Sequence, residues 1–110
     1  MPDDFHNYID GTWTGAASGD TFSVSNPAAP TDLIGQFPAS GPADVDEAVA
    51  AAADALSAWD HRPAPQRGTI LREAGDLLAD RKTDIARTMT REMGKPFFET
   101  KGDVQEAIDT

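Results

Sequence analysis

The chain has 110 residues, enough for one small domain or for part of a larger one. Nineteen acidic residues against nine basic ones give a formal net charge of −10. That charge disfavours nucleic acid and anionic membranes as partners, because both require clustered cations. The sequence has no cysteine, no apolar run long enough to span a membrane and no apolar signal segment at its start. We therefore expect a cytoplasmic protein without disulfides or thiolate metal sites.

The acidic residues are spread along the chain and are mostly aspartate, while only three of the basic residues are lysine. A terminal acidic interaction tail is therefore disfavoured. We predict a surface adapted to high salt, where screening weakens the repulsion between like charges.

Residues 1–39 have the composition of short strands and tight turns. The stretch FHNYIDGTWT reads as strand, turn and strand, with Asp10-Gly11 as the hairpin signal. Residues 21–25 alternate with period 2 and stop at Asn26-Pro27, and residues 33–37 form another short run that ends at Pro38. The pattern predicts three or four short antiparallel strands.

From residue 40 onward the apolar spacing becomes helical. A first helix is expected from Pro42 to about residue 59, followed by a break at residues 61–65. Its apolar stripe consists of residues that recur every three or four positions: Val45, Val49, Ala52, Leu56 and Trp59. Asp44 and Asp46 lie in its first turn, where the helix dipole favours anions.

Three more helices are predicted. One begins near Pro65, and its expected buried face is Ile70, Leu71, Ala74, Leu77 and Leu78. The next runs from about Thr83 to Met93 and stops at Gly94, with Pro96 following. The last begins near Phe98, and its apolar pattern is still running at Thr110. This unfinished pattern predicts that the sequence is truncated at residue 110.

No residue pattern in the chain predicts catalysis. Glycine-rich nucleotide loops of the GxGxxG and GxxxxGK[ST] types are absent. His6 and His61 have no neighbouring ligand at metal spacing, which favours solvated loop histidines. Ser18, Ser23 and Ser25 have no positioned base. From these patterns we expect no catalytic and no cofactor-binding residue.

The amino-acid sequence nevertheless resembles the N-terminal part of the aldehyde dehydrogenase superfamily. Seven segments occur in that family's order: NYIDGTW at 7–13, TFSVSNPA at 21–28, IGQFP at 34–38, DVDEAVAAA at 44–52, AW at 58–59, RGTILREAGDLL at 67–78 and EMGKP at 92–96. GDVQEAID at 102–109 resembles the start of the helix that follows. No single segment is decisive, but the seven in register cover almost the whole chain.

The resemblance implies an α/β fold of which this chain is the N-terminal part, with short antiparallel strands followed by four helices. The full enzyme would be several times longer, with its Rossmann-type core and catalytic residues beyond residue 110. It would oxidise an aldehyde to a carboxylic acid through a cysteine thiohemiacetal, with NAD or NADP as cofactor. Residues 1–39 would join an oligomerisation or bridging sheet of a homodimer or homotetramer. Residues 40–110 would pack beside the cofactor-binding domain, and the 110 residues alone would be inactive.

The resemblance also implies a monovalent cation site. In several members of the family, backbone carbonyls just before the NPA motif and an acid just before the GKP motif hold such an ion. The matching positions are Val24, Ser25 and Glu92. Oxygen ligands of this kind suit a hard cation. The alternative for Glu92 is a surface acid at a helix C-terminus, where the helix dipole disfavours it.

Two other interpretations remain open. The chain could be a natural short, non-catalytic protein that acts as a structural or assembly subunit, or an unrelated helical binding module. The second requires seven ordered segments to coincide by chance. The choice of aldehyde and the choice between NAD and NADP are not encoded in these residues.

Overall fold

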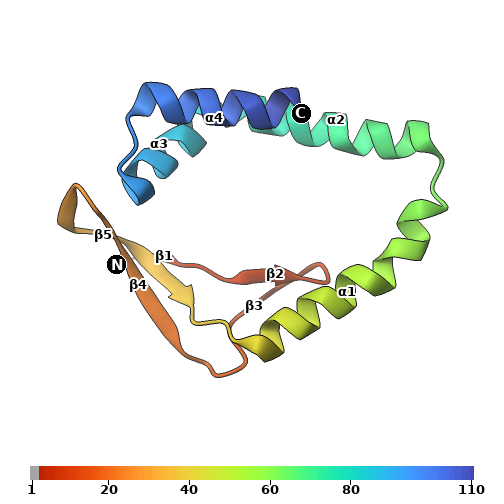
Figure 1. Cartoon of the computed structure of the whole chain (residues 1–110), viewed down its shortest axis with the longest axis horizontal. Coiled ribbons are helices and arrows are strands. Elements are labelled where there is room, and N and C mark those ends of the chain that lie inside the picture. Colours follow the sequence, from red (N-terminus) through yellow and green to blue (C-terminus); the bar gives the residue numbers. More distant parts are fainter. Residues whose placement is uncertain (1–2) are drawn as a thin grey trace. The chain divides into compact units, whose positions relative to one another are not determined.

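The computed structural model describes residues 3–110 (Figure 1). The strands are β1 (Asp3–Asp4), β2 (Asn7–Ile9), β3 (Thr12–Thr14), β4 (Thr21–Asn26) and β5 (Ala29–Pro38). The helices are α1 (Pro42–Asp60), α2 (Ala64–Asp80), α3 (Lys82–Met93) and α4 (Phe97–Asp109). The predicted order of short strands followed by four helices is confirmed, and its boundaries differ by only a few residues.

The chain forms two compact units. The first consists of residues up to Ser25 together with Leu33–His61, and the second of Asn26–Asp32 together with Arg62–Thr110. These units do not divide at residue 39, and the domains expected at residues 1–39 and 40–110 of the full enzyme stay a prediction. Helix α1 belongs with most of the strand residues. The segment Asn26–Asp32, which contains the β4–β5 turn and the start of β5, belongs with helices α2 to α4.

In the first unit, β2 and β3 form an antiparallel hairpin in which Tyr8 faces Trp13. Asp10 and Gly11 both have positive φ, 49° and 72°. Two consecutive left-handed residues match the twist of a two-residue hairpin turn. The Tyr8 and Trp13 rings lie 4.8 Å apart between centroids. The hairpin predicted from Asp10-Gly11 is therefore confirmed.

The other sheet of the chain has the order β1-β5-β4. Its first pair is parallel, with Asp3 opposite Gly35. A Cβ at Gly35 would lie 2.5 Å from the Asp3 carbonyl oxygen and 2.5 Å from the Phe5 ring, so only glycine fits. The Phe5 ring stacks on Phe37 with a centroid distance of 4.5 Å. The parallel strand β1 was not predicted.

Helix α1 begins at a structural carboxylate. Asp44, buried in the first turn, accepts hydrogen bonds from the Gly41 backbone N–H (2.8 Å) and the Ala17 backbone N–H (2.7 Å). These two donors hold the pKa of Asp44 below its usual value. The place of Asp44 in the first turn was predicted, whereas its contact with the loop before β4 was not.

The second unit is built around the pairing of α3 with α4. Ala86 of α3 and Val104 of α4 are buried, and Thr100 of α4 is fully enclosed. Helix α3 ends at Gly94, whose φ of 75° confirms the predicted left-handed cap.

The predicted buried face of α2 is wrong for this chain. No residue of α2 is buried, and Leu71 and Leu77 are 65% and 55% exposed. The apolar spacing of the helix is as expected, but burial requires a partner surface that these residues do not supply.

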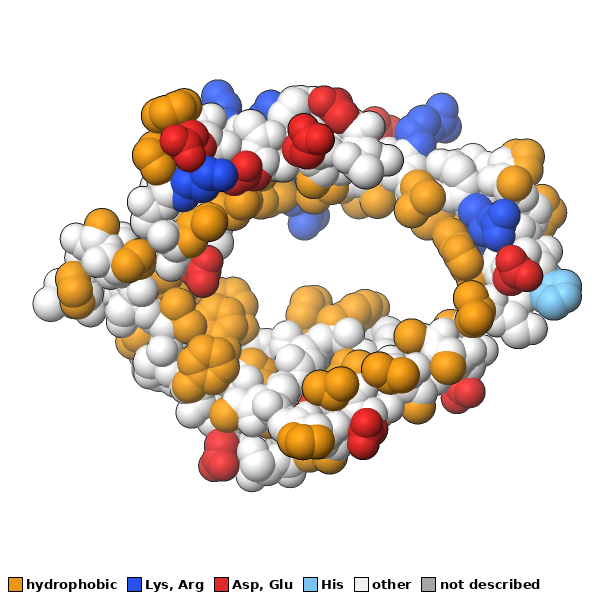
Figure 2. All heavy atoms as spheres, viewed as in Figure 1, with side chains coloured by type: hydrophobic (Ala, Val, Ile, Leu, Met, Phe, Trp, Pro, Cys, Tyr) orange, Lys and Arg blue, Asp and Glu red, His pale blue; other side chains and the backbone are white. Residues whose placement is uncertain are grey.

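Little apolar surface is buried overall. Among the described residues only Ile34, Ala86 and Val104 are buried hydrophobic side chains. The accessible surface is 7976 Å², against about 5,900 Å² for a folded monomer of this mass. Figure 2 shows hydrophobic side chains exposed along α1 and α2. No helix in the described part of the chain is long and apolar enough to cross a membrane.

Candidate functional site

The three predicted cation ligands occupy two different elements. Val24 and Ser25 are half-buried in β4, and Glu92 is exposed in the last turn of α3. The strand residues belong to the first compact unit and Glu92 to the second. Within residues 3–110 no group of three or more His, Asp or Glu side chains is arranged to hold a metal ion. A site of two carbonyls and one carboxylate is of a different kind, so this cation site stays a prediction.

The best-defined polar cluster in the second unit joins the start of strand β5 to helix α3. Arg91 donates to both carboxylate oxygens of Asp32, from Nε at 2.9 Å and from Nη2 at 2.5 Å. Asn26 donates from Nδ2 to the same carboxylate at 3.2 Å, and its Oδ1 accepts the Ala28 backbone N–H. A bidentate pair of this kind fixes orientation as well as charge.

These contacts determine the protonation state of Asp32. The hydrogen bond from Arg91, followed by that from Asn26, lowers the pKa of Asp32 from 3.8 to about 2. The carboxylate is therefore ionised at any pH near neutrality, and it is an acceptor in a structural contact. A groove of about 420 Å³ runs beside the cluster, with Arg87, Thr90 and Phe97 in its wall. It contains no nucleophile paired with a base.

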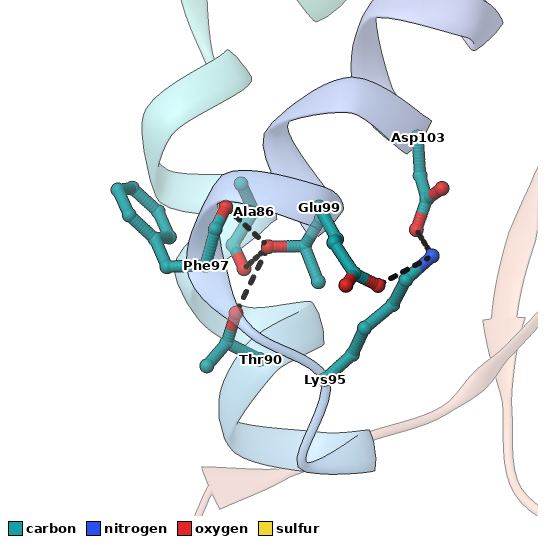
Figure 3. A network of polar contacts seen from close by, with 7 residues as sticks. Ala86, Thr90, Lys95, Phe97, Glu99 and Asp103 are labelled. Carbon is teal, nitrogen blue, oxygen red and sulfur yellow. Dashed lines mark hydrogen bonds and ion pairs between the residues drawn. The ribbon is translucent and has the colours of Figure 1, made fainter.

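A second polar cluster connects α4 to α3 by hydrogen bonds (Figure 3). The buried Thr100 hydroxyl lies 3.0 Å from the carbonyl oxygens of Ala86 and Phe97, which can accept its proton. The Thr90 hydroxyl lies 2.9 Å from it, and either hydroxyl can donate to the other. Because every described buried polar side-chain atom has a partner, this enclosed hydroxyl stabilises the fold.

Lys95, in the segment EMGKP, is held by the acids of α4. Its Nζ lies 2.6 Å from Asp103 and 3.9 Å from Glu99. The hydrogen bond to Asp103 and the charges of both acids raise the pKa of Lys95. The side chain therefore connects the link after α3 to the first two turns of α4, and its charge is already paired.

The described residues do not fit the diphosphate of NAD or NADP. That group requires backbone N–H donors at a glycine-rich helix start. Before α1, the Gly41 N–H donates to Asp44 of the same helix. Helices α2 and α4 follow Pro63 and Pro96, so neither of them starts in a glycine-rich loop. That no residue of this chain binds the cofactor stays a prediction.

The two histidines are exposed, and Nδ1 of His61 lies 2.7 Å from the Ser57 carbonyl oxygen of helix α1. Sequence reasoning missed the pair of Asp32 and Arg91, because its members are 59 residues apart. It also missed Thr100, since a threonine on a helix gives no local signal of burial. Lys95, Asn26 and Asp103 lay in recognised segments, but no partner of theirs was predicted.

A sequence profile of the aldehyde dehydrogenase family matches residues 13–110. The chain belongs to the aldehyde dehydrogenase family. Its relatives include the α-ketoglutarate semialdehyde dehydrogenase of Haloferax volcanii, 43% identical over 109 residues, which cover 99% of this chain and 23% of that protein. The chain thus spans about a fifth of the length of the curated relatives that it matches.

Solved structures of the family superpose on the chain. An NAD-dependent aldehyde dehydrogenase from Sinorhizobium meliloti gives a TM-score of 0.90 at 28% identity, over 99% of this chain and 22% of that one. An E. coli NADP dependent enzyme gives 0.89 at 39% identity, over 94% of this chain and 21% of that one. The fold of this aldehyde dehydrogenase segment is therefore that of the corresponding part of much longer enzymes.

Proposed function

We propose that these residues are the opening part of an NAD(P)-dependent aldehyde dehydrogenase that oxidises an aldehyde to a carboxylic acid. The observation that carries the proposal is the family match over residues 13–110. The similarity to an NAD-dependent and to an NADP dependent enzyme supports either cofactor. We further propose a cytoplasmic homodimer or homotetramer, to which the strands of residues 1–39 contribute.

The residues of this chain would act in such an enzyme as a scaffold. Asp44, Arg91 and Thr100 fix the start of α1, the β4–β5 turn and the α3–α4 pair, and all three are engaged within the chain. The cofactor would supply the hydride acceptor, and residues outside the chain would bind it. We therefore expect no turnover from the 110 residues alone.

The test is a chimaera in which this chain replaces the aligned segment of the Haloferax volcanii relative. In the buffer in which the parent enzyme is active, the chimaera should reduce NAD or NADP with α-ketoglutarate semialdehyde, measured by absorbance at 340 nm. The 110-residue chain at equal concentration should give no signal. A folded chimaera that binds the cofactor without turnover would contradict the proposal and would favour a non-catalytic assembly subunit.

The proposed cation site has its own test. If Val24, Ser25 and Glu92 hold a monovalent cation, KCl should stabilise the chimaera more than choline chloride at the same ionic strength. Glu92→Gln should remove that difference, while Glu73→Gln, an equal change on exposed α2, should leave it intact. Equal stabilisation by both salts in every variant would contradict the site.

A further inference from the structure

One of the two compact units contains no lysine or arginine. All nine lysine and arginine residues follow position 61 in the sequence, within the second unit. The first unit contains nine acidic residues and no lysine or arginine, whereas the second combines its nine bases with ten acids. The first unit therefore carries almost all of the net charge of the chain.

The same unit exposes a continuous apolar surface, the α1 stripe, formed by Val45, Val49, Ala52, Leu56 and Trp59. Val45, Val49 and Leu56 are 58%, 61% and 62% exposed. At 3.6 residues per turn these positions fall on one narrow face of the helix. A contiguous row of exposed aliphatic side chains is typical of an interaction site. The composition of the α1 stripe is therefore that of a contact surface.

The two borders of the α1 stripe are defined by the structure. On one side the β2–β3 hairpin lies against α1, and Tyr8, Ile9 and Asp10 line a groove with the alanines of the helix. On the other side α1 presents Asp46, one turn before Val49. The borders thus carry acids and, throughout the first unit, no base.

This charge pattern indicates which kind of surface can cover the α1 stripe. The same face of a second copy would bring α1 against α1, with acids facing acids, which like charges disfavour. An apolar surface bordered by lysine or arginine complements both the stripe and its rim. Since the chain spans about a fifth of its relatives, such a surface can belong to the same enzyme.

We propose that the α1 stripe docks on an apolar surface with a lysine- or arginine-bearing rim, in the part of the enzyme outside these 110 residues. The inference rests on the proposed function and adds to it the face of α1 that is covered and the chemistry of the surface that covers it.

The experiment uses the same chimaera with two pairs of substitutions in α1. The second pair lies one residue later along the helix than the first. Val49→Asp/Leu56→Asp places two carboxylates in the α1 stripe. Ala50→Asp/Ser57→Asp adds the same two charges to the same helix, but on a face outside the α1 stripe. We expect the first pair to lower the melting temperature by on the order of 5 °C or more and the control pair to change it much less. Equal shifts for both pairs would overturn the docking surface.

The rim is tested by neutralising single acids. The expected place of Asp46 in the first turn of α1 is wrong, because the helix begins at Pro42 and only Asp44 lies in that turn. The helix dipole therefore has little effect on Asp46. Asp54 lies on the far side of α1 from the stripe. Asp46→Asn should lower the melting temperature of the chimaera more than Asp54→Asn does. The opposite order would overturn the cationic rim.

Activity separates the two proposals. An inactive unsubstituted chimaera counts against the proposed function. An active chimaera that is indifferent to Val49→Asp/Leu56→Asp leaves the function standing and removes the docking surface. A chimaera in which those substitutions abolish a dimer, with the monomer unchanged in stability, would show instead that a second copy covers the stripe.

Discussion

Replacing Thr100 by valine should lower the free energy of unfolding of this chain by about 1 kcal/mol. Valine has nearly the same shape, so no cavity forms and only the hydroxyl is lost. The carbonyls of Ala86 and Phe97 lie inside helices and keep their helical N–H donors. The net loss is therefore about one hydrogen bond, that between Thr100 and its neighbours.

The assay is thermal and urea unfolding followed by circular dichroism. A loss of about 1 kcal/mol corresponds to a fall of roughly 4–8 °C in melting temperature for a domain of this size. Thr88→Val is the matched control, because the exposed Thr88 hydroxyl bonds only to its own helix at Asp84, and it should change stability by less than about 0.5 kcal/mol.

A double-mutant cycle isolates the contact between the two hydroxyls. Thr90→Val, Thr100→Val and the double variant should show a coupling of about 0.5–1 kcal/mol, as expected for contacting residues in one network. Strictly additive effects, or a Thr100→Val variant as stable as the parent, would refute the view that this enclosed hydroxyl holds α4 on α3.

Four further outcomes are expected. Because the pKa of Asp32 is lowered from 3.8 to about 2, its contact stabilises the fold fully above the pKa of the unfolded chain and is lost as the pH falls through about 2. An NMR titration of the Asp32 carboxyl group measures this pKa. A midpoint near the ordinary 3.8 would contradict the prediction. Gly35→Ala should destabilise the chain by about 1–3 kcal/mol in urea unfolding, since its Cβ would meet Phe5 and the β1 backbone; an unchanged midpoint would argue against that approach. Gly102→Ala, with open space around its Cβ in α4, should stabilise by about 0.5–1 kcal/mol in the same assay, and a loss of stability would be the contrary result. Raising KCl to on the order of 1 M should raise the melting temperature if the acidic surface is adapted to salt, and no rise would exclude that adaptation.

The sequence predicted those features that depend on neighbouring residues. The hairpin at Asp10-Gly11 and the end of α3 at Gly94 require a particular backbone conformation at one or two positions, and the residue type reveals it. The helices followed from apolar spacing in the same way. The family itself followed from segments in register.

Features that depend on distant residues were not predictable. The parallel pairing of β1 with β5 joins Asp3 to Gly35 and has no local sign. The contact of Asp32 with Arg91 and the burial of Thr100 arise only when separate elements meet. The buried face expected for α2 shows the converse, because Leu71 and Leu77 have the right spacing but are exposed in this chain. Spacing identifies a face suited to burial, and the covering surface decides whether it is buried.

The membership of residues 26–32 in the second unit has a consequence for dividing the chain. Each unit is discontinuous in sequence, so no single cleavage of the backbone separates them. A polypeptide that starts at Arg62 would have Arg91 without its Asp32 partner. Protease nicking between α1 and α2 should therefore yield two fragments that stay associated or unfold together, and gene dissection should move the β4–β5 turn with the helices.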